Sequence, residues 1–414
     1  MLYRYAHKRL RTFLEEAKRM KEIEFAYPHS KDLLECIIQN FENELYYLEQ
    51  SEGKPELTRD KSSNALANIF SFLPLLGFVL RSTNVRNSFE ILRPLLRLTR
   101  DVLHETSPDE TKLILSSEWD FSPLTYAGIP DLPGFVLIGL PAPESNNPLL
   151  TPLFGHELGH SVWAKGKIKN DFYLPMRSSV LEILNNRWSD CQLHFGPDAK
   201  SPESLTENFT VAQLWDPSLT SALWQVEEAF CDFIGLKLFG ASFLKAFAYL
   251  LSPNIGLRDV SYPSMETRVH FLVRASKKFS AEVPNEYDQF FDDDLPAASS
   301  PLDQFLLEVA DAAVEKRIEE VMDKAAELVD SSDAPAPSMG EADRIFSRFE
   351  QVVPAEHCTS LADIINAAWR AFENPKLWDA FPELKENRDN VLNELVFKNI
   401  EIFEIEHVTK NYAS

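Results

Sequence analysis

Apolar residues recur every three or four positions through most of this chain, a spacing typical of α-helices that bury one face. Before residue 109 the pattern predicts an N-terminal helical region over residues 1–108. Its predicted helices cover residues 9–22, 31–49, 64–81 and 87–104. The fold must therefore begin with packed amphipathic helices.

Two short runs interrupt the helical pattern in the middle of the chain. TKLILSS (111–117) and GFVLIGLP (134–141) are rich in Ile, Leu and Val, with Pro and Gly around them, as expected of strands. Helical spacing then resumes, and we expect a break near Gly240. The helices predicted within this central region, residues 109–285, cover 148–165, 178–192, 218–251 and 264–279.

The last region, residues 286–414, is predicted to be helical throughout. Acidic or Pro-rich segments at 290–301 and 330–340 punctuate it, and the second is the better candidate for a flexible linker. Its predicted helices cover 302–329, 340–353, 360–373 and 386–405. The three regions together predict a mainly α protein with a small β-sheet, an α+β fold.

Charge and hydropathy narrow the classes of partner. The formal net charge of -23 opposes binding to nucleic acid or anionic lipid through the overall field of the protein. The most apolar run, residues 65–80, is shorter than a bilayer span of about 20 residues and contains Asn68, Pro74 and Gly77, so we expect a buried helix and no membrane span. Residues 1–20 lack the continuous apolar core of a secretory signal, which favours the cytoplasm. The four cysteines form no CxxC pair, so we expect reduced, buried thiols.

The sequence GHELGH, residues 155–160, places two histidines four residues apart. On a helix His156 and His160 would project from one face about 6 Å apart, so both imidazoles can reach one metal ion. Glu157 would point about 100° around the helix, where it can act as a general base on water. The alternative is a histidine pair on a partly buried helix without a metal.

A catalytic zinc ion normally takes three protein ligands, so a third must come from elsewhere. Glu228 is the best candidate, because Asp232 lies one turn later and can accept the other ring proton of a ligand histidine. Glu227 is the rival ligand, but the residue one turn after it is Cys231. Both acids of the preferred pair lie in an apolar segment, where an unpaired buried charge is costly.

GHELGH and Glu228-Ala-Phe-Cys-Asp232 resemble the gluzincin metallopeptidases, in which the third ligand is a glutamate in an ExxxD arrangement on a second helix. The resemblance covers about residues 130–275 and implies a zincin-like catalytic core between helical flanks, with one catalytic zinc ion. It also implies that GFVLIGLP (134–141) is the strand at the edge of the cleft, which an extended peptide can join by backbone hydrogen bonds. A plain core strand is the alternative.

SYPSMETR, residues 261–268, is similar to the His-Pro-x-x-x-x-Arg element that follows the second helix in some gluzincin families, with Tyr262 in place of the histidine. Tyr262, Arg268 and His270 are the nearby candidates to stabilise an oxyanion. Arg268 can instead pair with a carboxylate in support of the ligands, and His270 can be a structural histidine.

The expected function is that of a zinc-dependent metallopeptidase, with His156, His160 and Glu228 as ligands and Glu157 as the base. The expected partners are a protein or peptide substrate and a regulatory protein that docks on the helical flanks. Two alternatives remain open. One is a catalytically idle zinc-binding regulatory protein, and the other is a zinc amidase that acts on a non-peptide bond.

Overall fold

The computed structural model describes residues 2–25, 28–82, 90–103, 111–118, 124–125, 134–141, 144, 146–253, 257–292, 294 and 300–413. It is mainly α-helical with a small β-sheet, as predicted. The chain divides into two compact units. Unit 1 comprises Met1–Thr99, Asp109–Asn146 and Glu404–Ser414, and unit 2 comprises Arg100–Pro108 and Asn147–Phe403.

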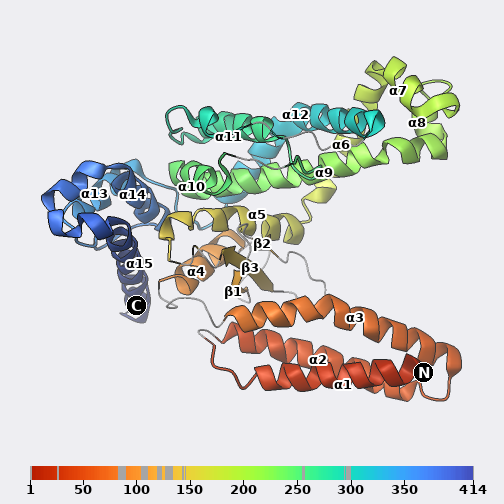
Figure 1. Ribbon diagram of the computed structural model, residues 1–414, viewed down its shortest axis with the longest axis horizontal. Coiled ribbons are helices and arrows are strands. Elements are labelled where there is room, and N and C mark those ends of the chain that lie inside the picture. The colour runs from red at the N-terminus through yellow and green to blue at the C-terminus, as the bar shows by residue number, and fades with distance from the viewer. Residues whose placement is uncertain are drawn as a thin grey trace. The chain divides into compact units, whose positions relative to one another are not determined.

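Three long helices at the start of the chain pack together in unit 1 (Figure 1). They are α1 (Leu2–Met20), α2 (His29–Gln50) and α3 (Pro55–Arg81). The rings of Phe41 and Phe72 meet edge to face in their shared core, with centroids 5.3 Å apart. The third helix begins earlier than predicted because residues 55–63 carry too few apolar side chains for a periodicity signal, while Pro55 favours a first turn.

The sheet of unit 1 has the strand order β1-β3-β2. Its strands are β1 (Lys112–Glu118), β2 (Leu124–Thr125) and β3 (Phe135–Pro141). β1 and β3 are parallel, with Ile114 paired to Leu137, and β2 is antiparallel to β3. Both longer strands were predicted, but β3 has a neighbour on each side. The expectation of an open strand edge therefore fails where β2 pairs with Ile138 and Gly139.

The strands belong to the core of the N-terminal helices, in contrast to the predicted division at residue 109. Ile114 and Leu137 share one hydrophobic cluster with Leu10, Ile37 and Phe72. The helix α4 (Leu92–Leu103) contributes its first part to unit 1, and its Arg97 lies 3.0 Å from the carboxylate of Glu404 near the chain end. A tertiary contact of this kind has no local sequence signal.

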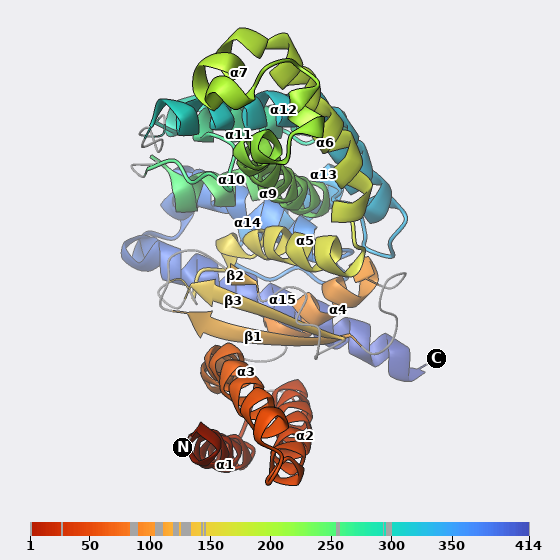
Figure 2. The ribbon, with the colours of Figure 1, turned by 90° about the vertical axis from the view of Figure 1, so that its right-hand side faces the viewer.

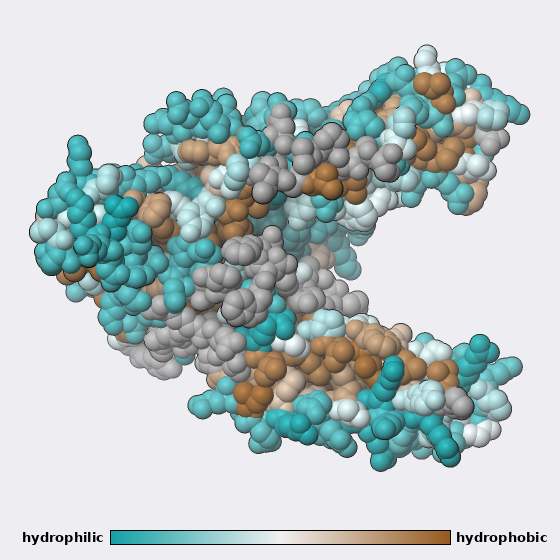
Figure 3. All heavy atoms as spheres, viewed as in Figure 1, coloured by the Kyte–Doolittle hydropathy of each residue, from teal (hydrophilic) through white to brown (hydrophobic). Residues whose placement is uncertain are grey.

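The apolar helix α3 is buried on one face only. The prediction of a buried helix therefore holds for that face and is wrong for the other. Phe70, Leu73 and Leu80 are 63%, 55% and 45% exposed. Figure 3 shows apolar side chains gathered along this helix. By length and composition α3 could cross a membrane, and 39% of its most apolar window is buried.

Unit 2 is built around one long helix, α9 (Phe209–Phe239), with α5 (Leu153–Lys165) and α12 (Pro301–Asp330) packed against it (Figures 1 and 2). The side chain of Asn208 caps α9 by accepting hydrogen bonds from Thr210 N and Val211 N. The expected break falls at Gly240, which has a φ of 61°. Two further helices of unit 2, α10 (Ala241–Leu251) and α11 (Met265–Phe279), follow the break.

The remaining helices of unit 2 confirm the helices predicted over 340–353, 360–373 and 386–405, but the single helix predicted over 178–192 is wrong, because the chain forms two helices that break at Arg187. The remaining helices are α6 (Lys169–Asn186), α7 (Trp188–Phe195), α8 (Ser204–Glu207), α13 (Met339–Phe349), α14 (Leu361–Glu373) and α15 (Arg388–Ala413), the last of which ends in unit 1. Short 3-10 turns lie at Pro148–Leu150, Gly196–Asp198, Tyr287–Phe290, Pro375–Ala380 and Pro382–Asn387.

The predicted boundary between a catalytic core and a C-terminal region does not correspond to a division of the structure. Asn366 of α14 bridges the break after α9, because its amide accepts from Ser242 N at 3.0 Å and donates to Phe239 O at 2.9 Å. Trp369 donates to Leu149 O at 3.0 Å, just before α5. The segment predicted as a flexible linker is also anchored, since Ser338 N donates to the carboxylate of Asp363 at 2.6 Å.

Candidate metal centre

The helices α5 and α9 approach each other more closely than ordinary side chains allow. A Cβ atom on Gly155 would lie 2.8 Å from Gly235 Cα, and one on Gly159 would lie 2.7 Å from Cys231 Cα. Real Cβ atoms essentially never make such short contacts. The two glycines of GHELGH therefore permit the contact, and His156 and His160, each directly after one of them, reach acidic residues of α9.

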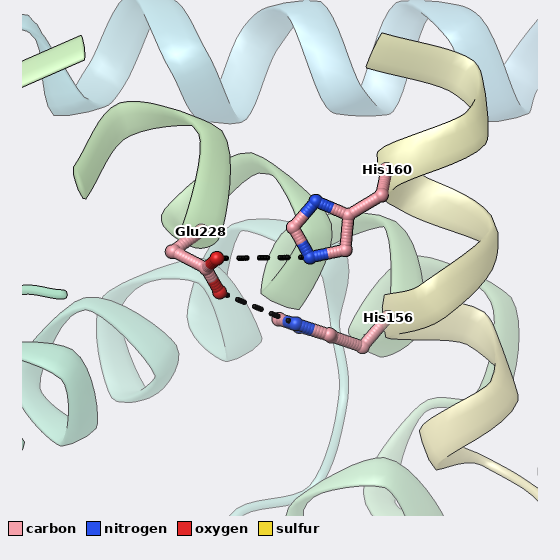
Figure 4. A group of neighbouring side chains, drawn as sticks. All are labelled: His156, His160 and Glu228. Carbon is pink, nitrogen blue, oxygen red and sulfur yellow. Dashed lines mark ion pairs between the residues drawn. The ribbon is translucent and has the colours of Figure 1, made fainter. Parts of the chain in front are cut away.

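The close contact places the two histidines opposite one glutamate (Figure 4). His156 Nε2 lies 3.4 Å from Glu228 Oε2, and His160 Nε2 lies 3.7 Å from Glu228 Oε1. The imidazole centroids are 5.1 Å apart and the ring planes meet at 82°. One potential ligand atom from each of the three residues lies within 4.8 Å of the other two. The structure thus brings the three sequence-predicted ligands together.

Each histidine also contacts a carboxylate through its other ring nitrogen. His156 Nδ1 lies 2.8 Å from Asp232 Oδ1, and His160 Nδ1 lies 3.1 Å from Glu227 Oε1. When Nδ1 carries a proton and donates it to the acid, the lone pair of Nε2 is directed toward Glu228. The contact between Asp232 and a ligand-candidate histidine, here His156, was predicted. Glu227, considered only as a rival ligand, instead contacts the back of the second imidazole.

Arg268 holds both oxygens of Asp232, one of which, Oδ1, also contacts His156. Its Nε and one terminal nitrogen donate to the two oxygens of Asp232 at 2.6 and 2.8 Å. The guanidinium lies against two aromatic rings, 4.8 Å from the centroid of Phe247 and 5.0 Å from that of Tyr262. Both members of this ion pair are buried. Arg268 therefore has the supporting position that was one of its two predicted roles.

Electrostatics keep the carboxylates of the cluster ionised. Burial raises the pKa of Asp232, but the positive charge and hydrogen bonds of Arg268 and His156 outweigh it and lower that pKa to about 2. Burial also opposes ionisation of Glu228, yet contact with His156 and the charges of His160 and Arg268 hold its pKa below the ordinary value. Burial lowers the pKa of His156, but the Asp232 and Glu228 carboxylates raise it to about 10.

Two further predicted residues lie close to this cluster. Glu157 is buried. Its negative charge helps to raise the pKa of Cys231 and that of Tyr262, although burial and the charge of Glu228 contribute more to both. The pKa of Tyr262 lies above its ordinary value, mainly because of burial and the charge of Glu228. Its hydroxyl group therefore stays protonated at neutral pH and can donate a hydrogen bond.

The structure does not bring His270 to the cluster. This residue is exposed on α11, whereas Arg268 of the same helix is buried against Asp232. Two positions along a helix correspond to a rotation of about 200°, so the two side chains point to opposite sides. The expectation of a catalytic role for His270 is not supported.

The donor set fits a metal ion. Glu228 Oε2 is buried and accepts no hydrogen bond, although buried carboxylate oxygens are normally paired. Two imidazole nitrogens, each with an acid at its other ring nitrogen, and one carboxylate are a ligand set that catalytic zinc takes. Within the described residues this is the one group of three or more His, Cys, Asp or Glu residues whose ligand atoms converge in this way.

Comparison with known proteins adds no assignment to this geometry. No protein-family model, curated protein or solved structure matches the chain.

Proposed function

We propose that this protein is a zinc-dependent metallopeptidase. The observation that carries the proposal is the convergence of His156, His160 and Glu228, with ligand atoms within 4.8 Å of one another, beside the buried carboxylate of Glu157. The pattern of one HExxH helix and one ExxxD helix, by which the sequence resembles the gluzincins, supports the same interpretation.

The three ligand side chains would leave one coordination position for water or substrate, as in catalytic zinc sites. A bound zinc ion would supply Lewis acidity, which polarises a peptide carbonyl and lowers the pKa of water toward about 7. Asp232 and Glu227 lie where they can accept the Nδ1 protons of the two neutral imidazoles, which would leave both Nε2 atoms for the metal.

Glu157 would move the proton in this reaction. Its carboxylate accepts a proton from the attacking water and then delivers it to the nitrogen of the breaking peptide bond, which leaves as an amine. The net reaction adds one water across the amide bond. Tyr262 is a candidate donor to the carbonyl oxygen as negative charge develops there.

The test combines zinc analysis with peptide hydrolysis on wild-type protein and the Glu157→Gln variant. We expect both proteins to bind one zinc ion per chain, because Glu157 is not a ligand. The variant should lose hydrolysis by about 100- to 10,000-fold, the usual contribution of a positioned general base. Wild-type turnover by Glu157→Gln would refute the assignment.

The same measurements separate the two alternatives. Stoichiometric zinc in a wild-type protein that cleaves no member of a peptide library would favour an idle, regulatory metal site. Hydrolysis of small non-peptide amides without peptide cleavage, shown by product analysis, would favour an amidase. Absence of zinc from the wild-type protein after reconstitution would contradict all three hypotheses.

A further inference from the structure

A loop with exposed apolar side chains lies beside the face of α9 that carries Glu228. Ser221, Gln225 and Glu228 follow each other at helical spacing on this face. Residues 257–262 run beside it, because Ser221 Oγ donates to Val260 O at 2.6 Å. At the far end of this loop, the ring of Tyr262 lies against Arg268, which holds Asp232. The loop therefore runs from Ser221 of α9 to the ion pair of Arg268 and Asp232.

The charged side chains of this loop are engaged with neighbours. Arg258 donates to both oxygens of Asp311 at 2.8 and 2.5 Å, and Gln225 donates to the same carboxylate at 3.0 Å. Asp259 accepts from the amide and the hydroxyl of Ser261 at 2.8 and 2.7 Å. The Arg258 bonds fix the loop on α12, the Ser221 bond fixes it on α9, and the Asp259 bonds hold a turn within the loop.

The apolar side chains of the loop, in contrast, face solvent. Leu257 is 72% exposed and Val260 is 45% exposed. A loop held by several hydrogen bonds would ordinarily turn such residues inward, since their burial is favourable. Their exposure on an anchored loop indicates a surface prepared for contact.

Trp224 adds an aromatic side chain to this surface. It lies one turn before Glu228 on α9, and at about 100° per residue it projects between the directions of Glu227 and Glu228. It is also three residues after Ser221, whose hydroxyl group contacts Val260, so helix geometry places the indole toward the side of α9 that the loop crosses. Its ring is 45% exposed. A half-exposed tryptophan next to a ligand residue is a typical anchor for an apolar group.

We infer that Trp224, Leu257 and Val260 form a subsite that receives a bulky apolar side chain of the substrate, next to the bond that is cleaved. This inference rests on the proposed peptidase function and adds a substrate class to it, namely peptides with Leu, Phe or a similar residue beside the scissile bond. Because Arg258 is engaged by Asp311, the surface of the loop is set by the exposed Leu257 and Val260, which favours apolar over acidic side chains.

The test compares two peptides that differ only in Leu or Ala next to the scissile bond. For the zinc-loaded wild-type protein we expect kcat/KM to be about 10- to 100-fold higher for the Leu peptide, the range of discrimination that an apolar pocket supplies. In Trp224→Ala this ratio should fall to within about threefold of unity. Zinc content and circular dichroism of the variant check that its site and fold are intact.

Phe209→Ala is the matched control. Phe209 is an aromatic residue of the same helix, 76% exposed, and lies four turns before Trp224 at the start of α9. This variant should keep the wild-type ratio. An equal ratio in wild type and Trp224→Ala, or a wild-type preference for a charged residue, would overturn the subsite while leaving the peptidase function in place.

A binding experiment keeps the subsite testable if no peptide is cleaved. The zinc-loaded Glu157→Gln protein should bind the Leu peptide about tenfold more tightly than the Ala peptide, and Glu157→Gln combined with Trp224→Ala should not distinguish them. Failure of all wild-type cleavage with this binding difference present would remove the peptidase proposal alone. Failure of both measurements would remove both proposals.

Discussion

Three acids within six residues of α9 have three different tasks at the candidate centre. Glu228 faces both Nε2 atoms, Asp232 contacts His156 Nδ1 at 2.8 Å, and Glu227 contacts His160 Nδ1 at 3.1 Å. Only Asp232 is in turn held by a buried cation, Arg268. The two outer acids should therefore affect zinc binding alike and protein stability differently.

Replacing each outer acid by its amide tests this division. Asp232→Asn and Glu227→Gln should each weaken zinc binding by about 10- to 100-fold, because each imidazole loses the acid that orients it. Zinc competition with a chelating dye measures this. Equal zinc affinity of Glu227→Gln and wild type would show that the contact with His160 has no orienting role.

Stability should separate the same two variants. Asp232→Asn leaves the buried guanidinium of Arg268 without its charge partner and should cost about 3–5 kcal/mol of unfolding free energy. The Glu227 side chain is 26% exposed, so Glu227→Gln should cost less than about 1 kcal/mol. Urea unfolding of both variants without zinc provides the comparison, and similar losses would contradict it.

The cysteines give a second measurement at the residue scale. Burial raises the pKa of Cys191 to about 11 and that of Cys231 well above its ordinary value, and both thiols are inaccessible. Cys36 and Cys358 are partly exposed. Alkylation of native protein at pH 8 should modify Cys36 and Cys358 and spare the other two, as read by mass spectrometry. Rapid modification of Cys231 would show that α5 and α9 separate readily.

At the scale of elements, the decisive feature is the glycine contact between α5 and α9. Gly159 lies where a Cβ would come 2.7 Å from the backbone of α9 at Cys231. Because that obstacle is backbone, it cannot rotate away. Any side chain at this position must push the two ligand-bearing helices apart.

Gly159→Ala is therefore expected to destabilise the protein by about 1–3 kcal/mol through overpacking and to weaken zinc binding. The matched control is Gly340→Ala, since Gly340 lies in α13 and a methyl group added there would meet no atom within 4 Å. The control should be neutral or more stable by up to about 1 kcal/mol, the helix propensity of alanine over glycine. Thermal unfolding and zinc titration of both variants test this prediction. Equal stability and equal zinc affinity of Gly159→Ala and Gly340→Ala would exclude the tight contact between α5 and α9.

Elements were predictable where one local signal set them. Gly240 ends α9 with a positive φ, and Ser264 caps α11 through Thr267 N, so both boundaries fall where expected. The convergence of the proposed ligands His156, His160 and Glu228 followed from spacing along two helices. The position of Glu227 could not be predicted in this way, because its contact with His160 depends on how α5 and α9 cross.

At the scale of the whole molecule, the sequence predicted the class of fold but not its division. The strands precede α5 in the chain, yet Ile114 and Leu137 pack into the core of α1, α2 and α3. Helix α14, from the last third of the chain, reaches back to α9 and to Leu149 through Asn366 and Trp369. Such contacts between distant segments leave no periodicity in the sequence.

Zinc removal should reveal the same division in solution. The proposed ligands all belong to unit 2, so zinc at about 100-fold its Kd would stabilise that unit by about 2.7 kcal/mol. Chelation should accordingly speed amide hydrogen exchange in α5 and α9 and leave exchange in α1, α2 and α3 unchanged. Uniform acceleration across the chain, or none, would contradict this expectation.

The contact between α5 and α9 also limits the substitutions that such a chain can accumulate during evolution. Every missense change in a glycine codon adds at least one carbon, so substitution of Gly155, Gly159 or Gly235 is disfavoured for reasons of space alone. If the protein binds the proposed metal, the histidines would be kept only while selection retains it. A descendant that abandoned its chemistry would lose the imidazoles first, and the three glycines would persist as the trace of its ancestry.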